Sequence, residues 1–196
     1  IGNTPEDGRV VFGANSNYTF TGSTITPFPV GGTWTTPNNI VIGGNITLNN
    51  TAAFDLNGTL TINSGRTLRL NTTAGADINL KNTMTVIGTF DTNGQNVILN
   101  GGGTANLIIS GTFITRDADG FNGIGASVPN IPLSISGTVN YAGTNQIITD
   151  APYFNLTITG SGTKTLAANV ISANGELNVT GTSNLLRIEA NKTLSI

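Results

Sequence analysis

The sequence predicts an all-β fold, and three observations support this class. Thr, Val, Ile, Asn and Gly dominate the chain, whereas the strong helix formers Lys, Glu, Gln, Arg and Met are scarce. Short segments alternate apolar and polar residues with a period of two, as in Ile46-Thr47-Leu48, Leu60-Thr61-Ile62 and Leu133-Ser134-Ile135. Clusters of Asn, Gly and Ser, such as Asn63-Ser64-Gly65, separate these segments and turn the chain. Each alternating segment is therefore predicted to be a short strand with one aliphatic face.

The predicted strands repeat along the chain. When residues 44–57 are written above residues 58–71, the four large apolar positions align, at an offset of about 14 residues. Ile46 then meets Leu60, and Phe54 meets Leu68. The opening Gly-x-apolar pattern recurs further along at uneven spacing, at Gly88, Gly111, Gly137 and Gly175. Self-similarity of this kind indicates a repeat architecture with loops of variable length.

Two architectures use such a pattern, a parallel β-helix (β-solenoid) and an antiparallel β-sandwich. In the β-helix each coil stacks on the one before it, and aliphatic side chains fill the shaft. The sandwich usually has longer strands and bulkier aromatic core residues, whereas only 6% of this chain is aromatic. Asparagines at repeated corner positions (Asn57, Asn71 and Asn100) also suit stacked amide ladders. The sequence favours the parallel β-helix, with the sandwich as the alternative.

The 196 residues are enough for one domain with a sizeable core. Residues 1–36 contain three prolines and little alternation after Phe20, which predicts an irregular cover or a first coil. Residues 37–196 are predicted to form the solenoid repeats. Within them, the segment 116–132 carries Pro129 and Pro132 and is predicted to be a loop that bulges from one coil.

Composition excludes much of enzyme chemistry. The chain has no His and no Cys, so it has no Ser-His-Asp triad, no Cys nucleophile, no thiolate zinc site and no disulfide. Only 9% of the residues are charged, against about 25% in a typical soluble domain. A net charge of −2 and a pI near 4.8 do not provide the basic face that nucleic acid requires. No apolar stretch approaches the roughly 18–20 residues of a membrane helix. The prediction is a non-catalytic protein with no nucleic-acid partner and no membrane span.

One loop carries paired carboxylates. Asp117 and Asp119 stand in the run Arg116-Asp117-Ala118-Asp119-Gly120, which resembles the start of a Ca²⁺ loop with oxygen ligands. The spacing of an EF-hand fails, because the third ligand and the distal Glu are absent. A polar loop with Asx-turns explains the same residues. The same two aspartates are also candidates for a glycosidase acid/base pair, but that reaction needs a sugar cleft, usually with aromatic side chains that stack on the sugar. Ca²⁺ at Asp117 and Asp119 is the one cofactor that the sequence suggests.

Aromatic residues and threonines suggest two kinds of binding surface. Phe28 and Trp34 in the N-terminal segment, together with Phe121 in the 116–132 loop, are candidates for contact with a carbohydrate or another ligand. Threonines recur at i and i+2 in several strands, an arrangement that could order water on an ice-binding solenoid. Such a surface needs consecutive coils of constant length, and Thr is also simply a good outward-facing strand residue. The pairs are Thr33/Thr35, Thr59/Thr61, Thr83/Thr85, Thr157/Thr159 and Thr163/Thr165.

Residues 139–181 contain two distinctive passages. Val139-Asn140-Tyr141-Ala142-Gly143-Thr144-Asn145-Gln146-Ile147-Ile148 is followed by a second distinctive passage from Tyr153 to Leu166, Tyr-Phe-Asn-Leu-Thr-Ile-Thr-Gly-Ser-Gly-Thr-Lys-Thr-Leu. These passages, together with residues 169–179, resemble the repeated regions of very large secreted surface proteins of Bacteroidota. The resemblance implies export, often by the type IX pathway, and an adhesin-like or filament-like role. It implies no catalytic or binding residue.

These observations lead to one expected function. The chain is expected to be a stiff extracellular β-solenoid, a structural or adhesive segment at a bacterial cell surface. Its expected partners are other copies or flanking repeats of the same protein end to end, and glycans or a host or substratum surface. The alternatives are a carbohydrate-binding or polysaccharide-cleaving β-helix and an ice-binding β-solenoid.

Overall fold

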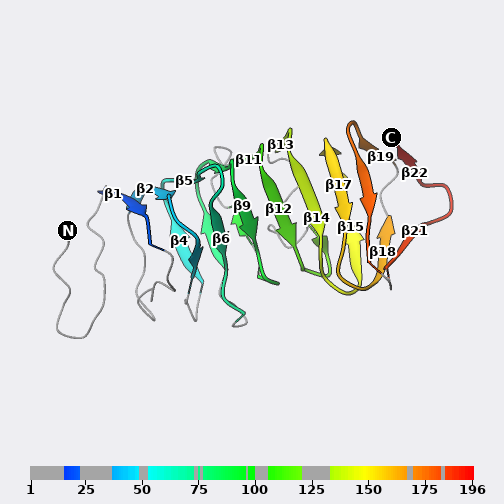
Figure 1. Cartoon of the computed structure of the whole chain (residues 1–196), viewed down its shortest axis with the longest axis horizontal. Coiled ribbons are helices and arrows are strands. Elements are labelled where there is room, and N and C mark those ends of the chain that lie inside the picture. Colours follow the sequence, from blue (N-terminus) through cyan, green and yellow to red (C-terminus); the bar gives the residue numbers. More distant parts are fainter. Residues whose placement is uncertain are drawn as a thin grey trace.

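The computed structural model describes residues 16–22, 37–48, 53–72, 75, 77–95, 97–99, 106–120, 133–166, 170–181 and 184–196. In these residues the chain forms short strands and no α-helix. The strands wind forward along one long axis, from the N-terminal end to the C-terminal end (Figure 1). Every strand pair that defines the sheets is parallel. The protein is thus a parallel β-solenoid, as the sequence predicts, and the antiparallel sandwich is wrong.

The described strands of the solenoid lie on three faces. The first face is a six-stranded sheet in the order β1-β2-β5-β8-β11-β13, beside which a three-stranded sheet of β16, β19 and β22 follows. Its strands are β1 (Ser16–Phe20), β2 (Pro37–Ile42), β5 (Thr59–Ile62), β8 (Met84–Val86), β11 (Leu107–Ile109), β13 (Leu133–Ile135), β16 (Pro152–Tyr153), β19 (Val170–Ala173) and β22 (Thr193–Ser195).

The second face is the longest continuous sheet of the described structure. It has seven strands in the order β20-β17-β14-β12-β9-β6-β3. Its strands are β3 (Ile46–Thr47), β6 (Thr67–Arg69), β9 (Thr89–Asp91), β12 (Thr112–Thr115), β14 (Thr138–Tyr141), β17 (Asn155–Ile158) and β20 (Leu177–Val179).

The described strands of the third face form two smaller sheets. Early turns supply a sheet in the order β10-β7-β4, and late turns supply one in the order β15-β18-β21. Their strands are β4 (Phe54–Leu56), β7 (Ile78–Leu80), β10 (Val97–Leu99), β15 (Gln146–Ile148), β18 (Gly162–Leu166) and β21 (Asn184–Ile188).

The register corrects the repeat length that the sequence suggested. Ile46 pairs with Leu68, and Leu60 pairs with Ile40. The stacked residues Asn45 and Thr67 are 22 residues apart, and later turns advance by 26, 17 and 21 residues. An offset of about 14 residues moves the chain by two strands instead of three, so it superposes one face of a turn on a different face of the next. It aligned well because all three faces use the same apolar alternation.

The inward positions build one aliphatic core along the shaft. Ile62 and Leu70 are fully buried, in agreement with their predicted inward orientation. Phe90 and Phe113 stack on adjacent strands of the seven-stranded sheet, with ring centroids 5.4 Å apart in an edge-to-face arrangement. Buried residues alternate with partly exposed ones along strands such as β5, β8 and β12. The buried side chains anchor these strands of three or four residues in the core.

The recurring Gly-x-apolar pattern marks one corner of the solenoid, between the six-stranded and the seven-stranded sheets. There the backbones of successive turns lie in close contact. A Cβ atom on Gly111 would lie 2.0 Å from the carbonyl oxygen of Gly88, and one on Gly137 would lie 2.1 Å from that of Gly111. Only glycine fits such an approach. The Gly175 position stacks instead on Asn155, whose side-chain oxygen accepts the Glu176 N–H at 2.9 Å.

Three sequence predictions concern segments that the structure describes only in part. Within residues 1–36, strand β1 pairs parallel with β2 and begins the six-stranded sheet. The 116–132 loop starts as a turn over residues 116–120, and its other residues lie outside the described ranges. Asn57 and Asn71 follow strands on different faces and so do not stack on each other, while Asn100 lies outside the described residues.

Candidate functional site

The predicted metal ligands Asp117 and Asp119 lie in the turn that leaves β12. The Asp117 carboxylate accepts the backbone N–H of Asp119 at 2.8 Å, and the Asp117 carbonyl oxygen accepts the N–H of Gly120 at 3.1 Å. This is an Asx-turn closed by a backbone bond. Among the described residues no group of three or more acidic side chains could hold a metal ion. The polar-loop interpretation therefore accounts for the hydrogen bonds of this pair.

The predicted aromatic contacts cannot be placed. Phe28, Trp34 and Phe121 all lie outside the described residues.

The threonine pairs do not form one array in the described structure. Only two of them stack on each other, because Thr61 pairs with Thr85 between β5 and β8. Thr157/Thr159 and Thr163/Thr165 belong to two other sheets, and Thr33/Thr35 lies outside the described residues. On either side of the stacked pairs, the row of Thr61 and Thr85 continues with Val41 and Ile108.

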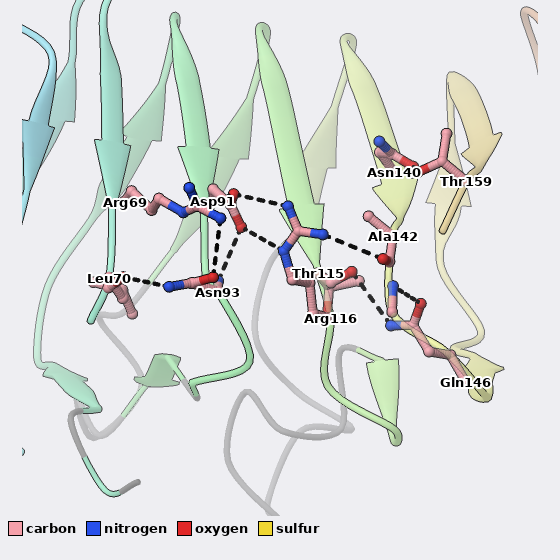
Figure 2. A network of polar contacts seen from close by, with 11 residues as sticks. Arg69, Leu70, Asp91, Asn93, Thr115, Arg116, Asn140, Ala142, Gln146 and Thr159 are labelled. Atoms are coloured by element: carbon pink, nitrogen blue, oxygen red, sulfur yellow. Dashed lines mark hydrogen bonds and ion pairs between the residues drawn. The ribbon is translucent and has the colours of Figure 1, made fainter. Parts of the chain in front are cut away.

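A cluster of charged and polar side chains lies on the outer side of the seven-stranded sheet, around Asp91 at the end of β9 (Figure 2). Asp91 is 6% exposed. Its carboxylate accepts Arg116 Nε at 3.2 Å and Nη2 at 3.0 Å from the following turn. It also meets Arg69 Nε at 3.3 Å from the preceding turn and accepts the N–H of Asn93 at 2.9 Å. We call Arg69, Asp91, Asn93 and Arg116 the clasp.

Asn93 holds a conformation that is uncommon for a residue with a side chain, at φ 53°. Its side-chain nitrogen donates to the Leu70 carbonyl at 3.0 Å, and its side-chain oxygen accepts Arg69 Nη2 at 3.1 Å. Asparagine tolerates left-handed backbone because its short polar side chain bonds locally. Here it also links the turn after β9 to the end of β6.

Arg116 extends the clasp to a fourth strand. While two of its nitrogens bind Asp91, its Nη1 donates to the carbonyl of Ala142 at 3.2 Å, just after β14. Figure 2 shows this guanidinium bridging the turns on either side of its own. The clasp therefore crosses β6, β9, β12 and β14, which are consecutive in the sheet.

A second polar group secures the same segment from inside the shaft. Gln146, the first residue of β15, is only 2% exposed. Its side-chain nitrogen donates to the carbonyls of Asp117 at 2.8 Å and Thr115 at 3.3 Å, and its oxygen accepts the N–H of Gly143 at 2.7 Å. The end of β12 is thus held on both sides of the sheet, by Arg116 outside and by Gln146 inside.

Lys164 occupies the position that stacks on Gln146 in the next turn. The residue is fully buried, and its ammonium donates to three carbonyls, those of Ser161 at 2.7 Å and of Gly143 and Thr144 at 2.9 Å. Burial lowers the pKa of Lys164. The three carbonyl oxygens stabilise its protonated form, so the ammonium closes a corner of the shaft.

Two tyrosines meet inside the C-terminal half of the shaft. The hydroxyls of Tyr141 and Tyr153 lie 2.6 Å apart, and both side chains are fully buried. Tyr153 donates to the Thr149 carbonyl at 2.8 Å, and Tyr141 accepts the Thr149 N–H at 3.1 Å. Burial raises the pKa of Tyr141, and burial together with the neighbouring Tyr141 phenol raises the pKa of Tyr153 still more.

The tyrosine pair predicts a loss of stability at alkaline pH. Because both native pKa values lie above the unfolded value of about 10, the native state binds more protons than the unfolded state once the pH passes 10. The free energy of unfolding should then fall by up to about 1.4 kcal/mol per pH unit for each tyrosine. Urea titrations between pH 8 and 11.5 measure this slope.

The Tyr153→Phe variant is the control for the alkaline slope. It should lose less stability above pH 10 than the wild type does. Lys164 acts in the opposite direction, because its lowered pKa means that the native state binds fewer protons there. This contribution is common to both proteins and cancels in the comparison. Equal slopes in the two proteins would contradict the assignment.

Sequence reasoning did not single out the clasp. The signal that would have found it is the true register, in which Arg69 and Asp91 are paired partners on adjacent strands. At an offset of about 14 residues, Arg69 and Asp91 do not align, so oppositely charged neighbours appeared unrelated.

The protein is a parallel β-solenoid. The clasp is a polar site that links one turn of it to the next. No protein-family model, curated protein or solved structure matched the chain significantly. No helix in the described ranges is long and apolar enough to cross a membrane.

Proposed function

We propose that the chain is a non-catalytic structural segment of an extracellular bacterial surface protein, a stiff β-solenoid that holds binding elements at a distance. The observation that carries this proposal is the unbroken stack of seven parallel strands, with an aliphatic core on one side and the clasp on the other. The polar groups with the most elaborate contacts bind backbone and side chains of neighbouring turns. These polar groups therefore bind other parts of the solenoid itself.

A solenoid suits a spacer because its length increases by one strand spacing per turn. Adjacent strands lie about 4.8 Å apart, and each turn contacts its neighbours through whole rows of backbone hydrogen bonds. Within the described residues, the outer strands of the seven-stranded sheet, β3 and β20, each pair with one neighbouring strand, and such edge strands are templates for further pairing. The proposed partners are therefore other copies or flanking repeats of the same surface protein, with glycans or a solid surface contacted through loops such as 116–132. Export and surface location rest on the resemblance of residues 139–181.

The stiffness of the shaft predicts a distance that can be measured. Thr47 and Asn178 belong to one row of paired residues that crosses the seven-stranded sheet. Six strand spacings of about 4.8 Å place their backbones about 29 Å apart. Because the chain has no cysteine, Thr47→Cys and Asn178→Cys can be spin-labelled selectively, and double electron–electron resonance reads the distance between the labels.

We expect a single narrow distribution for this pair. A second pair, Thr47→Cys with Thr157→Cys, is the matched control, because it spans one strand spacing fewer and should give a mean distance about 5 Å shorter. A broad distribution, or no difference between the two pairs, would contradict a stiff spacer. Surface location needs a separate test, in which antibodies against the folded chain should label intact source cells. Labelling only after lysis would overturn that part of the proposal.

A further inference from the structure

The solenoid geometry gives each turn contacts only with its two neighbours, so the expected behaviour is opening from the ends, one turn after another. Most side-chain bonds between turns follow this pattern and are neutral. Thr159 donates to Asn140 at 2.8 Å between β17 and β14, and Asn39 donates to Asn17 at 2.8 Å between β2 and β1. Each of these bonds joins one pair of turns.

The clasp differs because two of its members, Asp91 and Arg116, each bind two neighbouring turns at once. Asp91 receives Arg69 from one side and Arg116 from the other. Arg116 in turn binds Asp91 behind it and the Ala142 carbonyl ahead of it. Separation of β6 from β9, or of β9 from β12, removes one of the two cationic partners of the Asp91 carboxylate, whose side chain is 9% exposed. Such charge-assisted contacts contribute more than a neutral hydrogen bond.

The strands at the C-terminal end of the described structure have less support. Val179 in β20 and Ile188 in β21 pair with buried residues of the preceding turn but are 45% and 47% exposed, whereas Phe90 and Phe113 next to the clasp are fully buried. Local opening free energies are lowest where burial is least. In the described structure the side chains of β20 and β21 are therefore less buried than those around the clasp.

We infer that the clasp is a locking device, which makes β6, β9, β12 and β14 open as one cooperative unit while strands nearer the ends open turn by turn. Gln146 adds to the unit from the inner side, by binding the carbonyls of Thr115 and Asp117 at the end of β12. The inference extends the proposed spacer function, since a locked middle section would keep its length while the ends exchange.

Native-state hydrogen exchange of the whole chain, followed by mass spectrometry at several low denaturant concentrations, tests the device. In the wild type, amides of the four clasp strands should show a common protection factor and a common denaturant dependence, distinct from those of β20 and β21. In Asp91→Asn, which keeps the shape and removes the charge, protection of all four strands should fall by about tenfold or more, and their exchange should separate strand by strand.

Two further variants complete the test. Asn39→Ala removes neutral bonds to Asn17 and Thr59, outside the four clasp strands, and should lower protection in β1, β2 and β5 alone. If Asp91→Asn does not fold, Arg116→Lys keeps the positive charge but loses the two-nitrogen contact, and it should give a smaller loss across the same four strands. The inference of a locking device is wrong if hydrogen exchange in the wild type progresses evenly from one end. It is also wrong if Asp91→Asn lowers protection in β9 alone. If the spin-label distance distribution is narrow, neither of these two results contradicts the proposed function as a stiff spacer.

Discussion

Replacement of Ile62 by aspartate should unfold the turns on both sides of β5. Ile62 is fully buried and pairs with Ile42 and Val86 on the neighbouring strands. The change removes an aliphatic side chain worth about 1.5–3 kcal/mol and places an unpaired carboxylate in the core. We expect a loss of about 4–5 kcal/mol or more in the free energy of unfolding, measured by urea titration and by thermal melting followed by circular dichroism.

Thr61→Asp provides the matched control for this substitution. Thr61 precedes Ile62 in the same strand, and its side chain points to the outer side of the sheet, where it is only partly buried. The same new charge should cost about 1 kcal/mol or less there, because water still reaches it. Leu70→Asp, at another fully buried position, should repeat the large loss. Similar melts for Ile62→Asp and Thr61→Asp would show that the alternation does not define the interior.

Gly111→Ala should be strongly destabilising although it adds a single methyl group. A Cβ atom there would lie 2.0 Å from the Gly88 carbonyl oxygen and 2.3 Å from that of Ile87. Both are backbone atoms, and the Gly88 carbonyl oxygen is held by a hydrogen bond from the Thr112 N–H at 2.8 Å. Because neither can rotate away, the two turns must separate, and we expect a loss of about 3 kcal/mol or more. Chemical denaturation measures the loss.

A second glycine separates crowding from backbone conformation. Gly65 has a φ of 68°, but a Cβ atom added to it meets nothing within 4 Å. Gly65→Ala should therefore cost only the left-handed conformation, about 1–2 kcal/mol. If Gly111→Ala costs no more than Gly65→Ala, the close stacking of turns at the glycine corner does not limit stability.

The inner face of the solenoid was predictable residue by residue, whereas the stacking of its turns was not. Burial at Ile62 and Leu70 follows from alternation along a single strand, and alternation is a local property. Turn length is not local, since it depends on how many strands complete one circuit. The Gly-x-apolar positions at Gly111 and Gly137 did carry the right period, because only one corner brings the backbones into contact.

The candidate site shows the same division. Asp117 and Asp119 stand out in the sequence because they are close together, and the structure uses Asp117 to close an Asx-turn. Asp91 has no acidic neighbour and does not stand out. It became the centre of the clasp because stacking brings Arg69 from one turn and Arg116 from another to the same carboxylate.

The sequence by itself therefore determined the all-β class, the inward aliphatic rows and the tight corners, since these depend on residues a few positions apart. The tertiary structure alone decided the length of a turn, the register of the sheets and the partners of Asp91 and Lys164. The physical reason is that a solenoid places residues 17 to 26 positions apart in direct contact. Which of them meet depends on the winding of the whole chain.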